Sequence, residues 1–228
     1  MVELKGKKFE FGIDDEGYPE SLRCLKDPPK RLYGIGNPKA IAPGIGIIGA
    51  RKASSHGLDA ARRCAKQAAK RGFPVISGGA RGCDQEAHKG ALESECPTVV
   101  VFGTGADVIY PESGTELFQQ IIDTGGVIVS EAPWGTPPIA CRFVERNRII
   151  AALSELLVVA EAGIPSGTLG TAETALSLGK TVAAVPGGPD TPGGTETSDY
   201  LATKGARLVY DEETLEAALD ATLGTNVN

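Results

Sequence analysis

Short apolar runs rich in β-branched residues alternate with segments of helical periodicity from Ile45 almost to the end of this 228-residue chain. Such alternation is typical of βαβ units, in which helices bury both faces of a parallel sheet. Seven runs are expected to be strands: 45–48, 74–77, 98–102, 127–130, 156–160, 181–185 and 207–210. The pattern therefore predicts a doubly wound α/β fold, with a mostly parallel sheet of about seven strands and helices on both faces.

The segments between the runs carry small apolar residues at three- and four-residue spacing, which indicates amphipathic helices. The first follows the first strand, where Leu58, Ala61 and Ala65 would lie on one face. Further helices are expected at 84–92, 116–122, 145–154, 171–178 and 214–219. The proline-rich residues 1–44 are predicted to be an N-terminal arm, with a short strand, a small helix and an extended lead-in, before a single Rossmann-like domain of residues 45–228.

Composition narrows the classes of protein that this chain can represent. A net charge of −6 argues against a protein that coats duplex DNA by bulk positive charge, so any nucleic-acid site must be local. The five cysteines are scattered and form no Cys-x-x-Cys pair, so no zinc or other metal site is expected. No apolar run has the length of a membrane span or a secretory signal, which predicts a cytoplasmic protein without membrane partners.

The sequence contains neither a correctly placed dinucleotide-binding fingerprint nor a phosphate loop of the Gly-Lys-Ser/Thr type. The string Gly44-x-Gly46-x-x-Gly49 matches the dinucleotide fingerprint, but its first two glycines lie before and within the apolar run, whereas the fingerprint must follow a strand. Position 69 is Ala, so the acidic residue that would bind the ribose is also missing. No Gly-Lys-Ser/Thr phosphate loop occurs either. We therefore predict that the protein has no NAD or other cofactor.

Glycine-rich loops follow most of the expected strands. Strands of a parallel sheet bring their carboxyl ends to one edge, so these loops should lie close together. Glycine lets backbone N–H groups approach an anion, and hydroxyls and arginines beside it favour phosphate. A purely structural role in tight turns is the alternative for any single loop. The residues expected to bind phosphate here are Gly49, Arg51, Ser77, Gly78, Gly79, Arg81, Ser166, Gly167 and Thr168.

A second group of candidate residues lies at 142–148, where the sequence RFVERNR opens an expected helix. Arginine can hold phosphate and an aromatic ring can stack on a base, which is the combination that a single strand requires. The alternative is a solvated helix start in which the phenylalanine packs locally. The residues of this group are Phe143, Arg146, Asn147 and Arg148.

Taken in order, these motifs resemble the DNA-processing protein A (DprA/Smf) family. They are GIIGAR at 46–51, SGGARGCD at 77–84, AH at 87–88, YP at 110–111, SE at 130–131, FVERNRII at 143–150, SGT at 166–168 and VPG at 185–187. The resemblance extends over about residues 18 to 210. It implies an extended Rossmann-like fold, binding of single-stranded DNA, protection of incoming DNA in natural transformation, loading of a RecA-type recombinase, a homodimer, and no catalysis.

The same resemblance assigns roles to several candidate residues. It implies that Arg51 contacts a phosphate, that Phe143 is the aromatic of the Phe-x-x-Arg-Asn-Arg motif, and that Arg146 and Arg148 are its basic members. The usual proline after the aromatic is Val144 here, which is a departure from the family pattern. The helical domain that many members place first and the winged helix that many place last are not expected in these residues.

The loop at 166–173, SGTLGTAE, supports a rival interpretation. It is similar to the Pro-Gly-Gly-x-Gly-Thr-x-x-Glu loop of the Lonely Guy phosphoribohydrolases, although the leading proline is absent. That resemblance implies a nucleoside monophosphate hydrolase or a nucleotide sensor, in which Glu173 assists N-glycosidic cleavage and Arg146 or Arg148 anchors the phosphate. Favourable placement of Glu173 in the first turn of a helix is the structural alternative. An interaction protein with a vestigial site is the third possibility.

Overall fold

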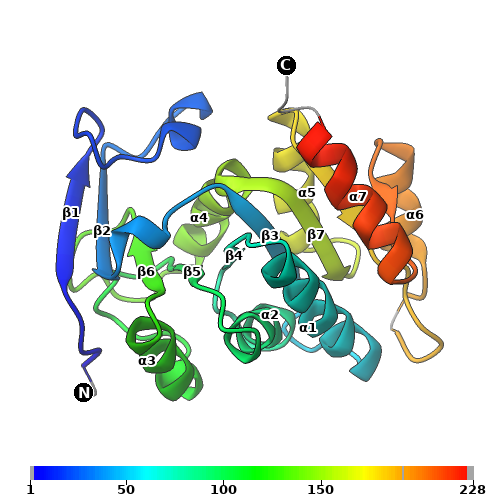
Figure 1. Cartoon of the computed structure of the whole chain (residues 1–228), viewed down its shortest axis with the longest axis horizontal. Helices are drawn as coiled ribbons and strands as arrows, with labels where there is room; N and C mark the ends of the chain where they lie inside the picture. Colours follow the sequence, from blue (N-terminus) through cyan, green and yellow to red (C-terminus); the bar gives the residue numbers. More distant parts are fainter. Residues whose placement is uncertain (1–2, 192, 225–228) are drawn as a thin grey trace.

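The computed structural model describes residues 3–191 and 193–224, which fold around one nine-stranded sheet (Figure 1). The strand order is β1-β2-β6-β5-β4-β3-β7-β8-β9. The strands are β1 (Lys8–Gly12), β2 (Arg31–Gly36), β3 (Gly44–Gly49), β4 (Val75–Ser77), β5 (Thr98–Val101), β6 (Val127–Ser130), β7 (Ser154–Glu161), β8 (Thr181–Ala184) and β9 (Arg207–Leu208). All seven expected strands are present and pair in parallel, so the predicted doubly wound fold is confirmed.

Helices cover both faces of the sheet, as expected. They are α1 (Ser55–Lys70), α2 (Cys83–Glu93), α3 (Thr115–Asp123), α4 (Ala140–Leu153), α5 (Gly167–Ser177), α6 (Glu196–Thr203) and α7 (Glu212–Gly224). Buried side chains of α4, α5 and α6 form one core cluster with one face of the strands. Buried side chains of α1, α2 and α7 pack on the other face, where α3 continues the layer. The short helix α6 was not expected from the sequence.

The first two strands lie within the segment that was expected to be a lead-in. Strand β1 pairs antiparallel with β2, and β2 pairs antiparallel with β6, which extends the sheet beyond the seven predicted strands. Tyr18 closes the connection between β1 and β2, because its buried hydroxyl donates a hydrogen bond to the carbonyl oxygen of Pro29 at 2.7 Å. Leu22 is fully buried in the same connection. Residues 8–36 are thus part of the sheet and its core.

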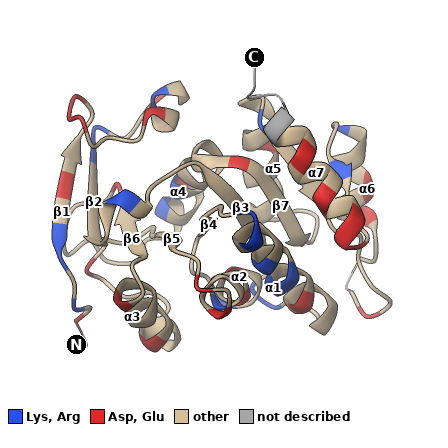
Figure 2. Cartoon of the chain, in the orientation of Figure 1, with Lys and Arg blue, Asp and Glu red and all other residues tan. Residues whose placement is uncertain are grey.

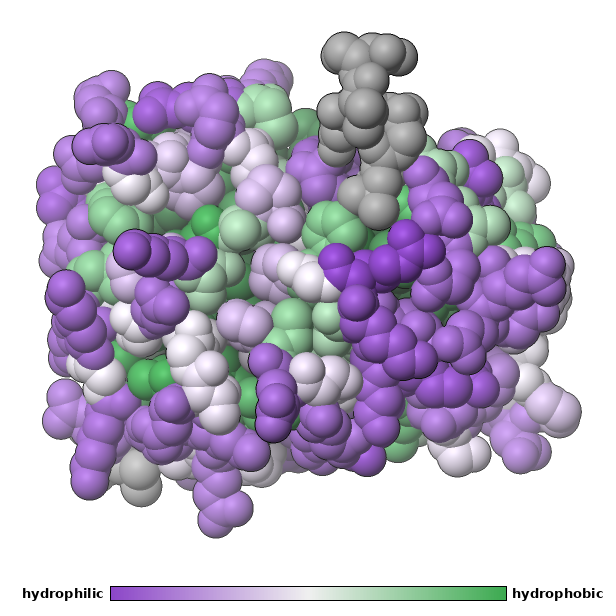
Figure 3. Space-filling model, viewed as in Figure 1, coloured by the Kyte–Doolittle hydropathy of each residue, from purple (hydrophilic) through white to green (hydrophobic). Residues whose placement is uncertain are grey.

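Charged side chains join α7 to α1. Arg71 donates to Asp220 at 2.8 Å and also to Glu216, and Lys70 lies 3.3 Å from Glu212. Figure 2 shows the acidic residues of α7 beside the basic residues of α1, and Figure 3 shows the hydrophilic surface that results. Exposed pairs of this kind add little stability. They do, however, place these cations at the end of α1 next to carboxylates, so this surface offers no field of unpaired positive charge.

The chain order reverses between β3 and β7, which are neighbours in the sheet. From β3 the chain builds outward through β4, β5 and β6, and from β7 it builds the other way through β8 and β9. The loops that leave β3 and β7 therefore diverge and leave a crevice at the carboxyl ends of these strands. Crevices of this origin are the usual ligand sites of open α/β sheets.

Candidate nucleic-acid interface

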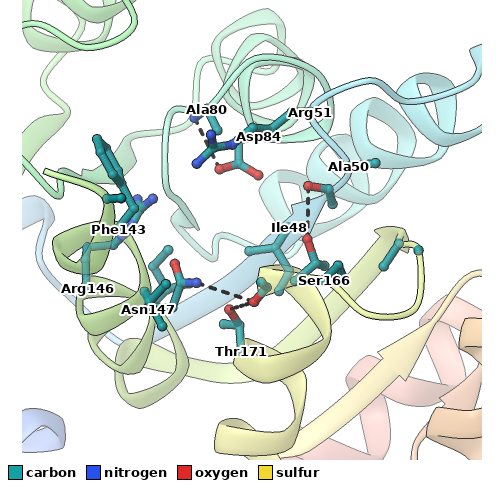
Figure 4. Close-up of a pocket in the computed structure, with 18 of the residues that line it drawn as sticks. Ile48, Ala50, Arg51, Ala80, Asp84, Phe143, Arg146, Asn147, Ser166 and Thr171 are labelled. Atoms are coloured by element: carbon teal, nitrogen blue, oxygen red, sulfur yellow. Dashed lines mark hydrogen bonds between the residues drawn. The ribbon is translucent and has the colours of Figure 1, made fainter. Parts of the chain in front are cut away.

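A pocket of about 690 Å³ occupies this crevice, and we call it the switch-point pocket (Figure 4). Its walls come from the loop after β3, from α4, and from the start of α5. Eight of the thirteen predicted site residues line it: Gly49, Arg51, Phe143, Arg146, Asn147, Ser166, Gly167 and Thr168. The pocket thus joins the two groups of candidates that the sequence placed far apart.

An aromatic and cationic surface forms one wall of the pocket. The rings of Phe143 and Tyr110 lie 5.1 Å apart and are tilted by 42°. The guanidinium carbon of Arg51 lies 5.8 Å from the centre of the Phe143 ring. Arg51 is exposed and makes no ion pair among the described residues, so its charge is available to a ligand. In such a pair the ring can stack on a base, and the arginine can hold the phosphate of the same nucleotide.

Tyr110 was not among the predicted site residues. It is 40% exposed, lines the pocket and packs on Phe143. Its position in sequence carried a signal, since Tyr110 belongs to one of the motifs of the family resemblance. The hydrophobic residues Val144 and Ile139 are also exposed near the pocket mouth, at 68% and 44%. The mouth therefore offers apolar as well as aromatic contacts.

Arg146 lines the pocket but is only 4% exposed. One of its Nη atoms donates a hydrogen bond to the carbonyl oxygen of Val101. Burial lowers the pKa of Arg146 to about 10, although the nearby Asp84 carboxylate opposes this shift and the charge of Arg51 adds to it. Arg146 therefore remains protonated at neutral pH, and its guanidinium is directed into the protein. It is a structural cation at the base of the pocket, and not the open phosphate fork that the sequence suggested.

Arg148 points away from the pocket. It follows Arg146 by two positions, and on a helix that separation places side chains on opposite sides. One of its Nη atoms lies 2.6 Å from Oε2 of Glu131, and both side chains are about three-quarters buried. Arg148 therefore joins α4 to the end of β6. The expectation that all the basic residues of this motif meet in one groove does not match this placement.

The glycine loop after β4 reaches the pocket through Ala80, but its four predicted site residues do not line it. Ser77 donates its hydroxyl to the carbonyl oxygen of Ile47, and Gly78 packs against the guanidinium of Arg146. Gly79 has a positive φ of +71° and lies against Phe118. Arg81 is exposed, and its Nε donates to Ser113 Oγ at 3.2 Å. These residues shape the loop, but none of the four borders the pocket.

A buried carboxylate, Asp84, lies beside the glycine loop. This side chain is 6% exposed, and its Oδ2 accepts a hydrogen bond from the N–H of Ala80 at 3.3 Å. Burial raises the pKa of Asp84, whereas Arg146 and the backbone N–H groups of Ala80, Gly49 and Gly78 act to lower it. The sequence singled out these glycines but missed the carboxylate between them.

The start of α5 forms the opposite wall. Ser166 caps the helix, because its hydroxyl oxygen accepts a hydrogen bond from the N–H of Leu169 at 3.1 Å. Thr168 donates its hydroxyl to the carbonyl oxygen of Gly49 at 3.2 Å, which ties this wall to β3. A Cβ on Gly167 would lie 3.9 Å from Asn147 and would meet no closer atom. The first turn of α5 is therefore open to the pocket and carries the positive end of the helix dipole.

Glu173 does not lie where a phosphoribohydrolase would need it. It is exposed on α5, and its Oε1 accepts a hydrogen bond from the hydroxyl of Tyr200 at 2.7 Å. The lining of the switch-point pocket does not include it. A carboxylate directed at α6 cannot act on a nucleotide held between α4 and α5, so the geometry gives the hydrolase interpretation no support.

In the part of the chain that the structure describes, no helix is long and apolar enough to cross a membrane.

Comparison with known proteins places the chain in a family. The model of the family described as DNA recombination-mediator protein A matches residues 10–220. Protein Smf of Synechocystis is 38% identical over 213 residues, which are 91% of this chain and 53% of that protein. Protein Smf of Escherichia coli is 38% identical over 89% of this chain and 54% of its own length. The chain thus spans about half the length of these relatives.

Solved structures agree with this placement. DNA processing protein A (DprA) from Streptococcus pneumoniae superimposes with a TM-score of 0.84 at 33% identity, covering 92% of this chain and 74% of its own. DprA from Helicobacter pylori, described for its single-stranded DNA binding mode, also gives 0.84, at 27% identity over 98% and 99% of the two chains. A molybdenum cofactor binding protein from Rippkaea orientalis, at 19% identity and a TM-score of 0.58, shares the fold alone. The chain belongs to the DNA recombination-mediator protein A family, that is, the DprA/Smf family of DNA-processing proteins.

Proposed function

We propose that this protein binds single-stranded DNA, without reading its sequence, in the switch-point pocket. The observation that carries the proposal is the meeting of the Phe143–Tyr110 rings, the free guanidinium of Arg51 and the open start of α5 in one crevice. An unpaired base can stack on the rings while Arg51 and the N–H groups of α5 hold the backbone. The DprA of Helicobacter pylori, which shares the fold, binds single-stranded DNA.

The same features favour single strands over duplexes. Stacking on Phe143 needs a base that is free of its partner, and a paired base presents only its edge. The net charge of −6 and the pairing of α1 cations with carboxylates leave little charge for a duplex backbone. In this proposal the protein is a binding protein and not an enzyme, and release of free base from AMP would contradict that part.

Membership of the family supports a cellular role in this proposal. The protein acts in the cytoplasm in DNA processing and natural transformation, protects the incoming strand and loads a RecA-type recombinase. Family membership also supports a homodimer formed through the later part of the fold, in which two pockets on one strand raise avidity. Light scattering should therefore give twice the mass of the chain, and a strict monomer at high concentration would contradict the dimer.

Arg51→Ala is the variant that tests the phosphate contact. Arg51 is the exposed arginine of the pocket, so its loss should weaken binding to all single-stranded sequences about equally. It should also lower the slope of log K against log salt by about 0.7 to 1, since one fewer counterion is released. Fluorescence anisotropy with a labelled oligonucleotide at several salt concentrations measures both effects.

Arg63→Ala is the matched control for this measurement. Arg63 is an exposed arginine on α1 that lies 3.2 Å from Asp59, away from the pocket lining. Its replacement removes the same charge from the protein and should leave affinity and slope unchanged. If Arg51→Ala and Arg63→Ala behave alike at every salt concentration, Arg51 does not contact the strand.

A further inference from the structure

Two positions at the carboxyl edge of the sheet that are built to hold anions already contain carboxylates of the protein itself. The first is the concave group of backbone N–H donors formed by the glycine loops after β3 and β4, which we call the N–H nest. Asp84 lies in it and accepts a hydrogen bond from the N–H of Ala80 (Figure 4). The N–H groups of Gly49 and Gly78 also act on this carboxylate. Concavities of this kind bind phosphate in many proteins.

The nest has the other properties of an anion site as well. Arg146 supplies the compensating positive charge, and its guanidinium packs against Gly78 at the base of the switch-point pocket. The Nε of Arg146 is buried and has no hydrogen-bond partner in the described part of the chain. Asp84 and Arg146 both line the pocket, so the nest opens toward the space where a ligand would enter.

The second position is the start of α1. Glu161, at the end of β7, is 6% exposed and accepts a hydrogen bond from the N–H of Ser54 at 3.0 Å. The hydroxyl of Ser54 also donates to Glu161, and the hydroxyl of Thr191 lies 3.5 Å from it. No lysine or arginine pairs with Glu161 among the described residues. The carboxylate thus occupies the place at a helix start that favours a bound anion.

We propose that Asp84 is a specificity-determining residue, whose carboxylate fills the N–H nest and so excludes inorganic phosphate and the phosphate groups of free nucleotides from the base of the pocket. A DNA strand is then held by Arg51, by the start of α5 and by stacking, and not by the glycine loops. The inference rests on the proposed function only for this last step. Exclusion of phosphate itself follows from the contacts of Asp84.

Removing the carboxylate should convert the nest into a working anion site. In Asp84→Ala, the three N–H donors and Arg146 lose their anion and remain beside an opening of carboxylate size. Unpaired buried donors and an unpaired buried cation are costly, so an anion from solution that satisfies them should bind and stabilise the variant. In Asp84→Asn, the amide still occupies the space, so phosphate should not enter.

The experiment is thermal unfolding and calorimetric titration of the parent, Asp84→Ala and Asp84→Asn with inorganic phosphate, at ionic strength matched with sodium chloride. Phosphate at ten times its Kd should raise the Tm of Asp84→Ala by about 3 to 6 °C. The parent and Asp84→Asn should show no such rise. A folded Asp84→Ala that binds phosphate no better than the parent would overturn the proposal.

The parent alone decides the matter if Asp84→Ala does not fold. Because its nest is filled, the parent should bind phosphate only at Arg51 and the start of α5, and a shift of the amide signals of Gly78 and Ala80 on phosphate titration would overturn the proposal. A DNA titration of the parent separates this inference from the proposed function. If a folded Asp84→Ala does not bind phosphate but DNA is bound, only the inference is refuted. If Asp84→Ala binds phosphate but DNA is not bound, only the proposed function is refuted.

Discussion

Arg146→Ala is expected to lower the free energy of unfolding by about 3 to 5 kcal/mol, because it leaves the buried Asp84 without its counter-charge. Arg146 is 4% exposed and Asp84 is 6% exposed, so both charges are largely removed from solvent in the parent. The hydrogen bond from Arg146 to Val101 is lost as well. Denaturant titration of parent and variant at neutral pH measures the difference directly.

The pH dependence of this loss identifies its cause. Burial raises the pKa of Asp84, so the folded state holds a proton more tightly than the unfolded state, and removing Arg146 should raise this pKa further. The unpaired Asp84 carboxylate therefore destabilises Arg146→Ala to its full extent at pH values above the pKa of Asp84 in the folded state. This destabilisation is relieved as pH falls toward the unfolded value of about 3.9. The difference in stability between parent and Arg146→Ala should thus shrink with falling pH.

The double variant Asp84→Ala/Arg146→Ala is the control for this account. Neither charge remains in it, so its loss of stability should be smaller than the sum of the two single losses, as expected for two buried charges that attract each other. A loss of less than about 1 kcal/mol in Arg146→Ala that is constant with pH would show that Arg146 is not a structural cation.

Phe143→Ala is expected to weaken binding of single-stranded DNA by about 1 to 3 kcal/mol, or roughly 5- to 150-fold. The variant loses the stacking surface and also the ring over which Arg51 lies at 5.8 Å. Stacking releases few counterions, so the salt slope should change little. Anisotropy titrations at several salt concentrations separate this behaviour from that of Arg51→Ala.

Phe143→Tyr keeps the ring and is the control for shape and packing. It should bind single-stranded DNA about as well as the parent. Since Arg51 and Phe143 are in contact, the double variant Arg51→Ala/Phe143→Ala should lose less affinity than the sum of the single losses. Full additivity would mean that the two residues contact the strand independently.

The parallel part of the sheet could be predicted well from the sequence, because each of its strands can be recognised from its own residues and the loops beside it. Buried strands of 4–8 apolar residues stand out between glycine loops, and all seven were found within a few residues of the expected bounds. The rejection of the dinucleotide fingerprint also agrees with the structure, since Gly44 and Gly46 lie inside β3. Only one short strand was expected before Ile45, where the structure has β1 and β2, because prolines interrupt that segment and β6, the partner of β2, is far away in sequence.

The site was predicted less completely, because it depends on where each side chain points, which the spacing of residues in the sequence does not give. The helix α4 begins at Ala140, and its rotation on the sheet directs Phe143 and Arg146 to the pocket and Arg148 to Glu131. A string of arginines does not reveal which one is buried. Likewise, the glycine loop looked like a phosphate site because the carboxylate that fills it, Asp84, becomes apparent only when the loop is folded.

The most direct test of the central claim is the affinity of the parent and of Phe143→Ala for a labelled single-stranded oligonucleotide and for a duplex of the same length. If unpaired bases stack in the switch-point pocket, the parent should bind the single strand at least about ten times more tightly than the duplex. Phe143→Ala should lose most of that preference. Equal affinity of the parent for both forms, unchanged in Phe143→Ala, would contradict the claim.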